Sequence, residues 1–487
     1  MNIAILSSEC FPFVKTGGLA DVVGTLPRYL AELGIAVKVF LPKYDSIDEK
    51  KFNLKFESEF GVTNVRVAGI PRAVYLHTAR ISNSSVEVYF IDCREYFFRG
   101  KIYSDAPDED ERFILFQKAV IEILQRLQWK PDVMHCNDWQ TGLIPILLKE
   151  NYSWDRMFDA TATLMSIHNI GYQGKFSYDA LWKAEIDPSR ERAVDALRFE
   201  GGVSFLKGGI LFSEIISTVS EMYAKEILTP HFGAGLQDVI KLREAVLHGV
   251  LNGIDIDEWN PETDTYLPVH YSAGNLSNKK IIKQTLLAKT TIPFDEAVPL
   301  IGIISRLVEQ KGFDLIESKI QELLALPAQW IILGSGKPQY ETLFQTMSKT
   351  FPHQCWCHIG FSNELAHLIE AGADMFLMPS HYEPCGLNQM YSLRYGTVPI
   401  VRKTGGLADT VRDWHDYAAQ NDYSGNGFSF VPAEGEALLH AVKRAIDSFH
   451  LPDEWKRIQQ NGMRGDFSWN SSARKYKRLY EQAIIRR

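Results

Sequence analysis

The sequence predicts an α/β protein built from two open parallel β-sheets, each covered by helices on both faces. Short apolar or β-branched runs alternate with longer amphipathic stretches along the whole chain, which is typical of parallel strands joined by helices. The strand candidates are too many for one doubly wound sheet. A stretch rich in Gly, Asn, Asp and Pro at residues 249–261 separates them into two groups.

The expected elements follow this pattern from the N-terminus. In the first group the apolar runs predict strands over residues 3–8, 37–41, 86–91, 133–136, 162–167 and 215–219, and a helix over 19–33. In the second group the same pattern predicts strands over residues 300–305, 330–333, 375–378 and 398–401. Residues 421–432 are turn-rich.

The chain length agrees with this division. With 487 residues, and about 150 residues per domain, two or three domains are expected. We therefore predict a first domain over residues 1–248, a second over 255–465 and a basic terminal helix over 466–487. The basic face of that helix is interpreted as solvated, with a binding patch as the alternative.

Composition and charge exclude several classes of protein. The net charge of −8 argues against a nucleic-acid surface. No apolar window is long enough for a membrane span, and the first residues lack the cationic start of a signal peptide. The six cysteines form no disulfide framework, which fits a reducing cytosol.

The sequence Lys-Thr-Gly-Gly-Leu-Ala-Asp occurs twice, at residues 15–21 and 403–409. Each copy follows a predicted strand and opens a predicted helix, where backbone N–H groups and the helix dipole favour an anion. The alternative is a glycine turn required only for close packing of strand and helix. Because there are two copies, each with a lysine, we favour an anion site. Its candidate residues are Lys15, Gly17, Gly18, Asp21, Gly405 and Gly406.

Two further motifs follow strands of the second domain. Arg306 and Lys311 lie after the strand at 300–305, and two cations at a strand end suit a diphosphate leaving group, with ordinary surface charge as the alternative. Glu383 lies in the run from Met378 to Leu387. It could hold sugar hydroxyls or stabilise a developing cation, or it could be a helix N-terminal acid. We interpret Cys385 as a buried apolar residue rather than a nucleophile.

Polar residues also follow two strands of the first domain. His135–Gly142 and Ser166–Gly174 place Asp138 and His168 where they suit sugar hydroxyls, and Trp139 or Tyr172 could stack on a sugar ring. The alternative is helix capping by Asn137 or Asp138.

Two segments contain metal-ligand types. The run from His353 to His358 lacks the usual zinc spacing and is interpreted as a buried strand. Asp255 and Asp257 fit an acid-x-acid clasp, but they lie in the predicted linker, where a turn is the better interpretation. We therefore predict no metal site. The absence of G-x-x-x-x-G-K-[ST] and of an early G-x-G-x-x-G disfavours P-loop NTPases and dinucleotide dehydrogenases.

Taken together, the motifs resemble those of bacterial glycogen synthases and plant starch synthases, in the same order from residue 1 to about 470. The likeness is carried by Lys15-Thr-Gly-Gly-Leu-Ala-Asp-Val, the Asn-Asp-Trp and His-Asn segments, Val250-Leu-Asn-Gly-Ile-Asp, Ser305-Arg-Leu…Lys-Gly, Glu383-Pro-Cys-Gly-Leu and the second Thr-Gly-Gly-Leu.

The resemblance implies the B-type glycosyltransferase fold, with two Rossmann-like domains facing each other across a cleft and a terminal helix returning to the first. It implies transfer of glucose from ADP-glucose to the non-reducing end of an α-1,4-glucan, with retention and without metal or other cofactor. It also implies a cytoplasmic protein, or a plastid one if the source is plant-like.

The family's site residues carry over to matching positions of this sequence. Catalytic roles are implied for Glu383, Arg306, Lys311, His168 and Asp138. Substrate contacts are implied for Lys15 with its glycines, Asn252, Cys385, Gly386, Leu387, Gly405 and Gly406.

This chain departs from relatives at two positions that bear on substrate and mechanism. Phe361 stands where a Tyr is common, so a hydroxyl contact to the base is lost. Tyr391 stands where many broader retaining relatives carry a second Glu. A UDP-glucose-dependent or non-glucan glucosyltransferase, a non-catalytic glucan-binding protein and a pyridoxal-dependent phosphorylase remain alternatives, and the sequence leaves the oligomeric state open.

Overall fold

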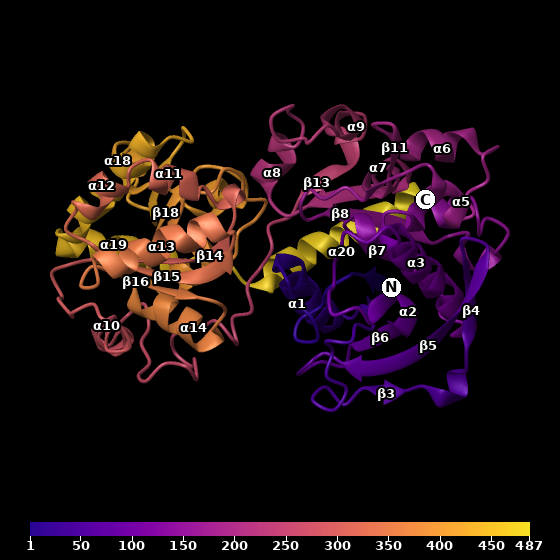
Figure 1. Cartoon of the computed structure of the whole chain (residues 1–487), viewed down its shortest axis with the longest axis horizontal. Helices are drawn as coiled ribbons and strands as arrows, with labels where there is room; N and C mark the ends of the chain where they lie inside the picture. The colour runs from indigo at the N-terminus through magenta and orange to yellow at the C-terminus, as the bar shows by residue number, and fades with distance from the viewer. The chain divides into compact units, whose positions relative to one another are not determined.

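The computed structural model describes all residues 1–487, which divide into two compact units. Unit 1 comprises Met1–Val250 and Trp469–Arg487, and unit 2 comprises Leu251–Ser468 (Figure 1). The chain thus passes from unit 1 to unit 2 inside the turn-rich stretch at 249–261 and returns to unit 1 for its last helix.

Unit 1 contains a ten-stranded sheet with a long parallel part. Its parallel strands lie in the order β13-β12-β8-β7-β1-β2-β6. They are β1 (Asn2–Leu6), β2 (Ala36–Pro42), β6 (Glu87–Asp92), β7 (Val133–Asn137), β8 (Ala162–Ile167), β12 (Ile215–Thr218) and β13 (Leu247–Gly249). Chain order reverses between β1 and β7, and open α/β sheets bind ligands at the strand ends of such a point.

The remaining edge of this sheet is antiparallel, a feature that the sequence pattern does not predict. Strand β5 (Ile70–Arg80) pairs antiparallel with β6, β3 (Lys55–Phe56) and β4 (Thr63–Val67). Ala68 and Gly69 join β4 to β5 with φ of 50° and 73°. Positive φ at both central residues suits a tight hairpin, which needs no crossover helix.

The helices of unit 1 surround this sheet. In α1 (Gly18–Glu32), apolar residues recur every three or four positions and are buried against the sheet. Helix α3 (Glu109–Arg126) is buried along most of its length. The shorter helices are α2 (Arg94–Phe97), α4 (Ile144–Lys149), α5 (Asp179–Lys183), α6 (Glu191–Leu197), α7 (Phe205–Phe212), α8 (Glu221–Glu226) and α9 (Gln237–Lys241), and a small sheet contains β9 (Lys175–Phe176), β10 (Arg198–Phe199) and β11 (Gly202–Ser204).

The C-terminal helix α20 (Trp469–Arg486) belongs to unit 1. In Figure 1 this yellow helix lies among the indigo and magenta elements of the N-terminal half. It packs against α1, β8, β7 and β12, and it buries Trp469, Tyr476 and Tyr480. The predicted return of the terminal helix to the first domain is therefore present.

Unit 2 contains a six-stranded parallel sheet in the order β16-β15-β14-β17-β18-β19. Its strands are β14 (Leu300–Leu307), β15 (Gln329–Gly336), β16 (Cys355–Ile359), β17 (Met375–Met378), β18 (Val398–Arg402) and β19 (Phe428–Phe430). This is the Rossmann strand order 3-2-1-4-5-6, with the reversal between β14 and β17. The short strand β19 falls in the segment that the sequence marked only as turn-rich.

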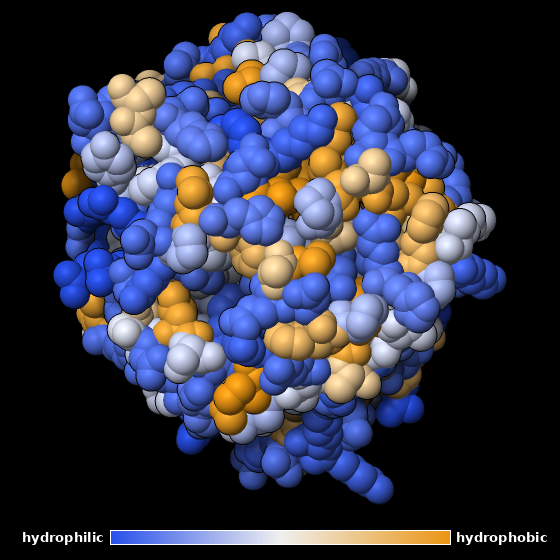
Figure 2. All heavy atoms as spheres, turned by 90° about the vertical axis from the view of Figure 1, so that its left-hand side faces the viewer, coloured by the Kyte–Doolittle hydropathy of each residue, from blue (hydrophilic) through white to orange (hydrophobic).

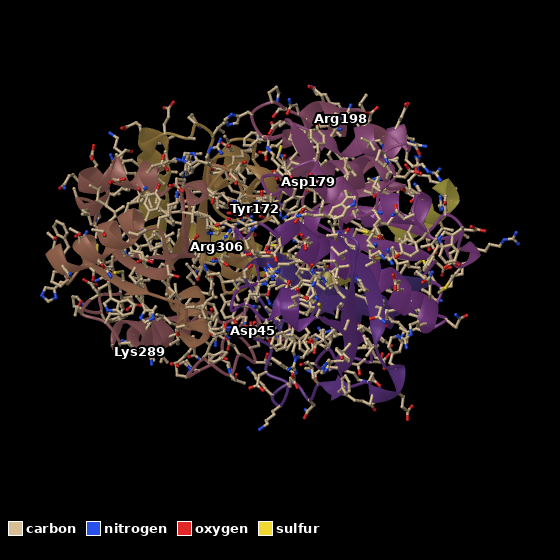
Figure 3. The ribbon with its side chains drawn as sticks, turned by 45° about the vertical axis from the view of Figure 1, so that its right-hand side comes forward. Asp45, Tyr172, Asp179, Arg198, Lys289 and Arg306 are labelled. Atoms are coloured by element: carbon tan, nitrogen blue, oxygen red, sulfur yellow. The ribbon has the colours of Figure 1, made fainter.

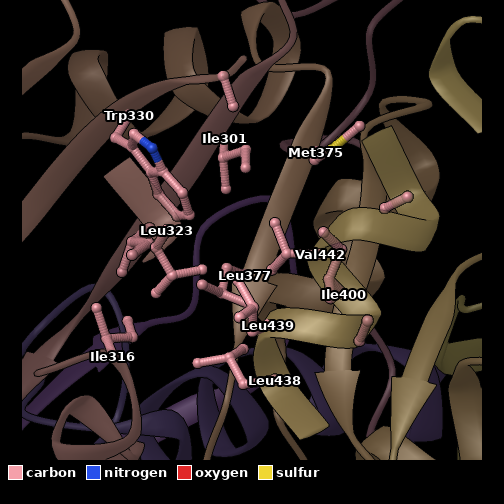
Figure 4. Close-up of a cluster of buried hydrophobic side chains, with 14 of the residues drawn as sticks. Ile301, Ile316, Leu323, Trp330, Met375, Leu377, Ile400, Leu438, Leu439 and Val442 are labelled. Carbon is pink, nitrogen blue, oxygen red and sulfur yellow. The ribbon is translucent and has the colours of Figure 1, made fainter. Parts of the chain in front are cut away.

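Helices cover both faces of the sheet in unit 2. They are α10 (Lys279–Leu287), α11 (Phe313–Glu317), α12 (Ile320–Leu324), α13 (Pro338–Thr350), α14 (Asn363–Gly372), α15 (Asn388–Arg394), α16 (Gly405–Thr410), α17 (Trp414–Ala418), α18 (Gly435–Phe449) and α19 (Pro452–Met463). One face packs α11, α12 and α18 on the strands through Ile316, Leu323 and Leu438, beside Trp330 and Leu377 (Figure 4). This core holds the strand ends in place.

Hydrophilic residues cover most of the face shown in Figure 2, with small groups of hydrophobic residues between them. None of the helices has the length and apolar character that crossing a bilayer requires.

Candidate active site

The loops after β14 and β17 pack directly on each other at the strand reversal of unit 2. Gly312 has φ of 72°, and a Cβ there would lie 2.1 Å from the carbonyl oxygen of Pro379. The backbone N–H of His381 donates to Gln310 O at 2.8 Å, and Gln310 Nε2 donates to Tyr382 O at 3.1 Å. A glycine is needed at 312 both for its φ and for this close approach.

This packing brings Lys311 and Glu383 together. Lys311 Nζ lies 2.5 Å from Glu383 Oε2, and the Ser380 hydroxyl donates to the same oxygen at 3.0 Å. Glu383 is only 6% exposed. The structure thus places a buried carboxylate and an ammonium group side by side at the position where open α/β sheets bind ligands.

Arg306, near the end of β14, is exposed (Figure 3). Its guanidinium is the second cation that the sequence predicted for this strand end. Unlike Lys311, it is not drawn into an ion pair with Glu383.

The second Lys-Thr-Gly-Gly loop packs on the backbone of the Glu-Pro-Cys-Gly loop. Cβ atoms at Gly405 and Gly406 would lie 2.0 Å from the carbonyl oxygens of Glu383 and Cys385, respectively. The N–H of Gly406 donates to Glu383 O at 3.1 Å and to Pro384 O at 3.2 Å. This N–H is therefore engaged within the chain, and the two glycines allow the two loops to touch.

The residues after Glu383 are held by hydrogen bonds from helix α15, which follows them, and from Asn252 at the start of unit 2. Gln389 Nε2 of α15 donates to Cys385 O and to Gly386 O at 3.1 and 3.0 Å. Asn252 hydrogen-bonds the Cys385 thiol, yet burial dominates and raises the thiol's pKa to about 12. The thiol is therefore protonated near neutral pH, which agrees with an apolar rather than nucleophilic Cys385. Leu387 precedes α15 and is partly buried.

Unit 1 carries a second cluster, at the ends of β1, β7 and β8. Lys15 follows β1, and its Nζ lies 2.7 Å from Asp21 Oδ1 at the start of α1. The loop between them is held by Glu9. Its carboxylate accepts hydrogen bonds from the backbone N–H of Thr16, the Thr16 hydroxyl at 2.6 Å and the backbone N–H of Gly17 at 3.1 Å.

Asp138 and His168 lie next to each other in unit 1. The backbone N–H of His168 donates to Asp138 Oδ1 at 2.7 Å, and Asp138 has φ of 57°, in the left-handed region. Burial raises the pKa of Asp138 to about 7, although the N–H groups of His168 and Asn169 oppose the shift. This carboxyl group can therefore change its charge near neutral pH.

His168 is neutral in this environment. Burial lowers its pKa to about 4. Its Nε2 lies 2.9 Å from Asn137 Oδ1, and Asn137 Nδ2 donates to Leu6 O. The Asn137 amide is thereby oriented so that Nε2 of His168 carries the proton and Nδ1 is an acceptor.

The sequence interpretation missed Glu9, Asn137 and Ser380 as supporting groups. Glu9 had one local signal, a carboxylate immediately after the first strand and ahead of a glycine-rich turn. For Asn137 the sequence indicates a sugar contact or a helix cap, but not its hydrogen bond to His168. Ser380 had no signal, because its role depends on its contact with Glu383.

The two segments with metal-ligand types have structural roles. The backbone N–H of Asp257 donates to Asp255 Oδ1 at 3.0 Å, which closes a turn, and Cys355–Ile359 form strand β16. No group of three or more His, Cys, Asp or Glu side chains in the chain has the arrangement of a metal site. All six cysteines are free thiols.

A surface cavity of about 620 Å³ lies elsewhere in unit 2. It is lined by polar side chains of α19 and of the segment at 422–424, among them Arg457 and Tyr423. None of the predicted site residues lines it.

Comparisons with known proteins give matches in both units of the chain. Residues 2–242 match the family model described as the starch synthase catalytic domain, and residues 285–462 match that of glycosyl transferases group 1. Glycogen synthase of Thermosipho melanesiensis is 42% identical over the full length of both chains. The chain belongs to the glycogen and starch synthase family.

Other members of the family agree with this assignment. Glycogen synthase of Koribacter versatilis is 43% identical, covering 99% of this chain and 98% of the relative. The catalytic domain of starch synthase IV from Arabidopsis thaliana, solved bound to ADP and acarbose, superposes with a TM-score of 0.90 at 33% identity over 99% of both chains. Sucrose-phosphate synthase from Thermosynechococcus elongatus shares the fold, with a TM-score of 0.61 at 16% identity.

Membership confirms the predicted family, the B-type glycosyltransferase fold and the enzyme class. The protein is a retaining glycosyltransferase of glycogen or starch synthesis. The roles of individual site residues stay predictions.

Proposed function

We propose that this synthase transfers glucose from ADP-glucose to the non-reducing end of an α-1,4-glucan with retention of configuration. The observation that carries the proposal is the Lys311–Glu383 pair at the strand reversal of unit 2. A cation there suits the departing diphosphate, and a carboxylate suits the sugar that becomes electron-poor as the diphosphate leaves. The Arabidopsis relative, solved with ADP and acarbose, supports the choice of nucleotide and glucan.

Most of the predicted groups have a role in this scheme. Arg306 and Lys311 neutralise the leaving ADP, and Lys15 with the N–H of Gly18 binds a phosphate. Asp138 and His168 hold sugar hydroxyls, as acceptors at the Asp138 carboxylate and at His168 Nδ1. Asn252, Cys385, Gly386 and Leu387 line the sugar. Gly406 takes no phosphate contact in this scheme, because its N–H is engaged by the backbone.

Retention proceeds without an enzyme nucleophile. The acceptor hydroxyl attacks the anomeric carbon on the face from which ADP departs, and its proton passes to the departing phosphate. A double displacement would need a second carboxylate. At the position where broader relatives carry one, Tyr391 is buried and stacks on Trp259 with ring centroids 3.9 Å apart.

We propose that the reaction needs no metal or other cofactor, because the cations named above already supply positive charge for the diphosphate. We further place the protein in the cytoplasm, where its six free thiols stay reduced. Its partners in this proposal are the donor and the glucan, with no nucleic acid and no membrane.

The deciding experiment measures ADP and UDP release from ADP-glucose and UDP-glucose, each with and without glycogen. We expect glycogen-dependent ADP release. Glycogen-dependent UDP release alone would establish the UDP-glucose alternative. That alternative is retained because Phe361, which is 83% exposed, offers no hydroxyl to hold an adenine base. Glycogen binding without release from either donor would contradict both proposed donors.

A further inference from the structure

Glu9 is a buried carboxylate at the start of the first Lys-Thr-Gly-Gly loop. It is 3% exposed. Its Oε2 accepts the backbone N–H groups of Thr16 and Gly17, and its Oε1 accepts the hydroxyls of Thr16 at 2.6 Å and Tyr103 at 2.5 Å. Tyr103 in turn lies 2.8 Å from the Ser8 hydroxyl. Four donors thus converge on one side chain that only accepts.

These contacts divide the backbone N–H groups at the start of α1 into two sets. Glu9 uses those of Thr16 and Gly17, whereas those of Gly18 and Leu19 have no partner within the chain. Helix α1 begins at Gly18, so both N–H groups belong to its first turn. Unpaired N–H groups of a first helical turn are the usual ligands of an anion.

The second copy of the same seven residues has a different arrangement. There the N–H of Gly406, the counterpart of Gly18, donates to Glu383 O and Pro384 O. Identical residues therefore leave this N–H open in one copy and occupied in the other. The difference comes from the residues that contact each loop. In the first copy Glu9 holds the loop, whereas in the second copy the backbone of residues 383–384 does.

We propose that Glu9 is a positioning residue of the donor site. It fixes the loop at residues 15–17 so that Lys15 and the N–H groups of Gly18 and Leu19 are available to a phosphate of the nucleotide-sugar. This inference rests on the proposed function. Glu9 favours phosphate binding by fixing the geometry of the loop and not by its charge. The negative charge of Glu9 would by itself weaken the binding of a phosphate.

Geometry and charge can be separated with two variants. In Glu9→Gln the amide oxygen can accept both backbone N–H groups, while its NH₂ donates to the hydroxyls of Thr16 and Tyr103, which accept instead. Glu9→Gln therefore keeps the loop and removes the charge. Glu9→Ala removes both and leaves the N–H groups of Thr16 and Gly17 without a partner.

Glu214 provides a matched control in the same unit. It is also a buried glutamate, and its Oε2 accepts both the backbone N–H and the hydroxyl of Thr163, each at 2.7 Å. Glu214→Ala thus removes the same kind of hydrogen bonds at a place without any predicted site residue. Glu214 also forms an ion pair with Lys149 at 2.6 Å, so Glu214→Ala should lose at least as much structural stabilisation as Glu9→Ala.

The experiment measures three quantities in the full-length chain: ADP affinity, the kcat and KM for ADP-glucose, and amide hydrogen exchange at residues 15–20. We expect Glu9→Ala to raise the ADP Kd and the KM by about tenfold or more, since misplaced binding groups act no better than missing ones. Exchange at residues 15–20 should rise as well. Glu9→Gln should stay within about threefold of wild type, and Glu214→Ala should change thermal stability without moving Kd or KM.

Wild-type affinity and exchange in residues 15–20 of Glu9→Ala would overturn the inference. So would tighter ADP binding by both Glu9 variants, which would make Glu9 an internal competitor of the phosphate. If the wild-type protein binds no ADP, the proposed function fails instead, and the exchange data alone decide whether Glu9 holds the loop. Should Glu9→Ala fold poorly, Tyr103→Phe removes one of the four donors and should give a smaller effect in the same direction.

Discussion

Glu383 shows how a single side chain acquires a chemical role from its neighbours. Next to Lys311 Nζ and the Ser380 hydroxyl it is held as a buried carboxylate, where a developing positive charge on a sugar would be stabilised. A helix N-terminal acid, the alternative drawn from the sequence, would not need this pairing.

Replacing Glu383 by Gln should lower kcat about 10²-fold or more, because the amide removes the charge that stabilises the transition state. Steady-state kinetics with ADP-glucose and glycogen would measure this. Glu370→Gln is the control. Glu370 is also buried and accepts a serine hydroxyl, from Ser392 at 2.6 Å, and burial raises its pKa to about 8. A folded Glu383→Gln enzyme with normal kcat would contradict the assignment.

Asp138 should impose an acid limb on kcat/KM near pH 7. Its pKa is raised to about 7 by burial, so below that pH the group gains a proton and can no longer accept a sugar hydroxyl with full charge. Activity should therefore fall as the pH drops through 7. In Asp138→Asn the limb should disappear along with most of the activity.

His168 supplies the control for this pH profile. Because its pKa is lowered to about 4, His168 stays neutral across the tested range. His168→Asn should therefore retain the limb near pH 7 at a lower overall rate. If the limb instead vanishes in His168→Asn and persists in Asp138→Asn, then His168 rather than Asp138 titrates near pH 7.

At the scale of elements, the two identical loops have different surroundings because they occupy different topological positions. In chain order, the first loop follows β1, which is the first strand of its sheet. The second loop follows β18, which is the fifth strand of its sheet. The second loop therefore lies beside the loop after β17 and packs on its backbone.

This difference predicts opposite outcomes for equivalent glycines. A Cβ at Gly17 would meet nothing within 4 Å, whereas one at Gly405 would lie 2.0 Å from Glu383 O at a φ of 45°. We expect Gly17→Ala to fold like wild type, and Gly405→Ala to lose about 2 kcal/mol or more of stability because the two loops must separate. Thermal unfolding followed by circular dichroism would measure both. Equal melting temperatures for the two variants would show that the loops do not pack as described.

The cationic side chains at the strand ends of unit 2 also predict that the reaction rate does not depend on metal ions. Because Arg306 and Lys311 provide the cations at the leaving group, excess EDTA should leave the initial rate unchanged. Loss of activity in EDTA with recovery in Mn²⁺ or Mg²⁺ would instead require a metal, with Asp255 and Asp257 as the first residues to test.

At the scale of the whole molecule, unit 1 is discontinuous in the chain. Its last element, α20, buries Tyr480 completely, and the hydroxyl of that residue lies 2.9 Å from Nδ1 of His135 in β7. The stability of the N-terminal sheet therefore depends on a helix that follows the whole of unit 2 in the chain.

Tyr480→Ala should destabilise unit 1 by about 3–5 kcal/mol, as expected for truncating a fully buried aromatic side chain. Hydrogen exchange should increase in β7 and β8 while β14 to β18 keep their protection. Ile485→Ala, on the same helix at a position that is 84% exposed, serves as the control and should change neither region. A uniform increase across both sheets would mean that the two units do not unfold separately.

Elements that are marked by a run of neighbouring apolar residues could be predicted from the sequence. The apolar run at residues 162–167 is strand β8 with the same bounds, and the parallel strands near β1 and β14 differ from prediction by a few terminal residues. The hairpin of β4 and β5 was missed. Strand β4 is short and lies at one edge of the sheet, and the turn after it begins with Ala68, a residue type that gives no indication of a positive φ.

The sequence by itself determined which motifs follow which strands. Lys15, Arg306 and Glu383 each lie in the segment that follows an apolar run, and parallel strands bring their carboxyl ends to one edge of a sheet. Two copies of a seven-residue motif, with Glu-Pro-Cys-Gly-Leu between them, were enough to indicate the family. These are properties of chain order and local periodicity, and they need no knowledge of distant contacts.

Only the tertiary structure decided what each of these groups touches. Lys311 and Glu383 are far apart in sequence and meet because β14 and β17 are neighbours in the sheet. The N–H of Gly18 is open and that of Gly406 is occupied, although both glycines lie in the same seven-residue sequence. The pKa of Asp138 follows from burial. Hydrogen bonding and desolvation depend on atoms that folding brings together from remote parts of the chain, and local sequence does not specify those atoms.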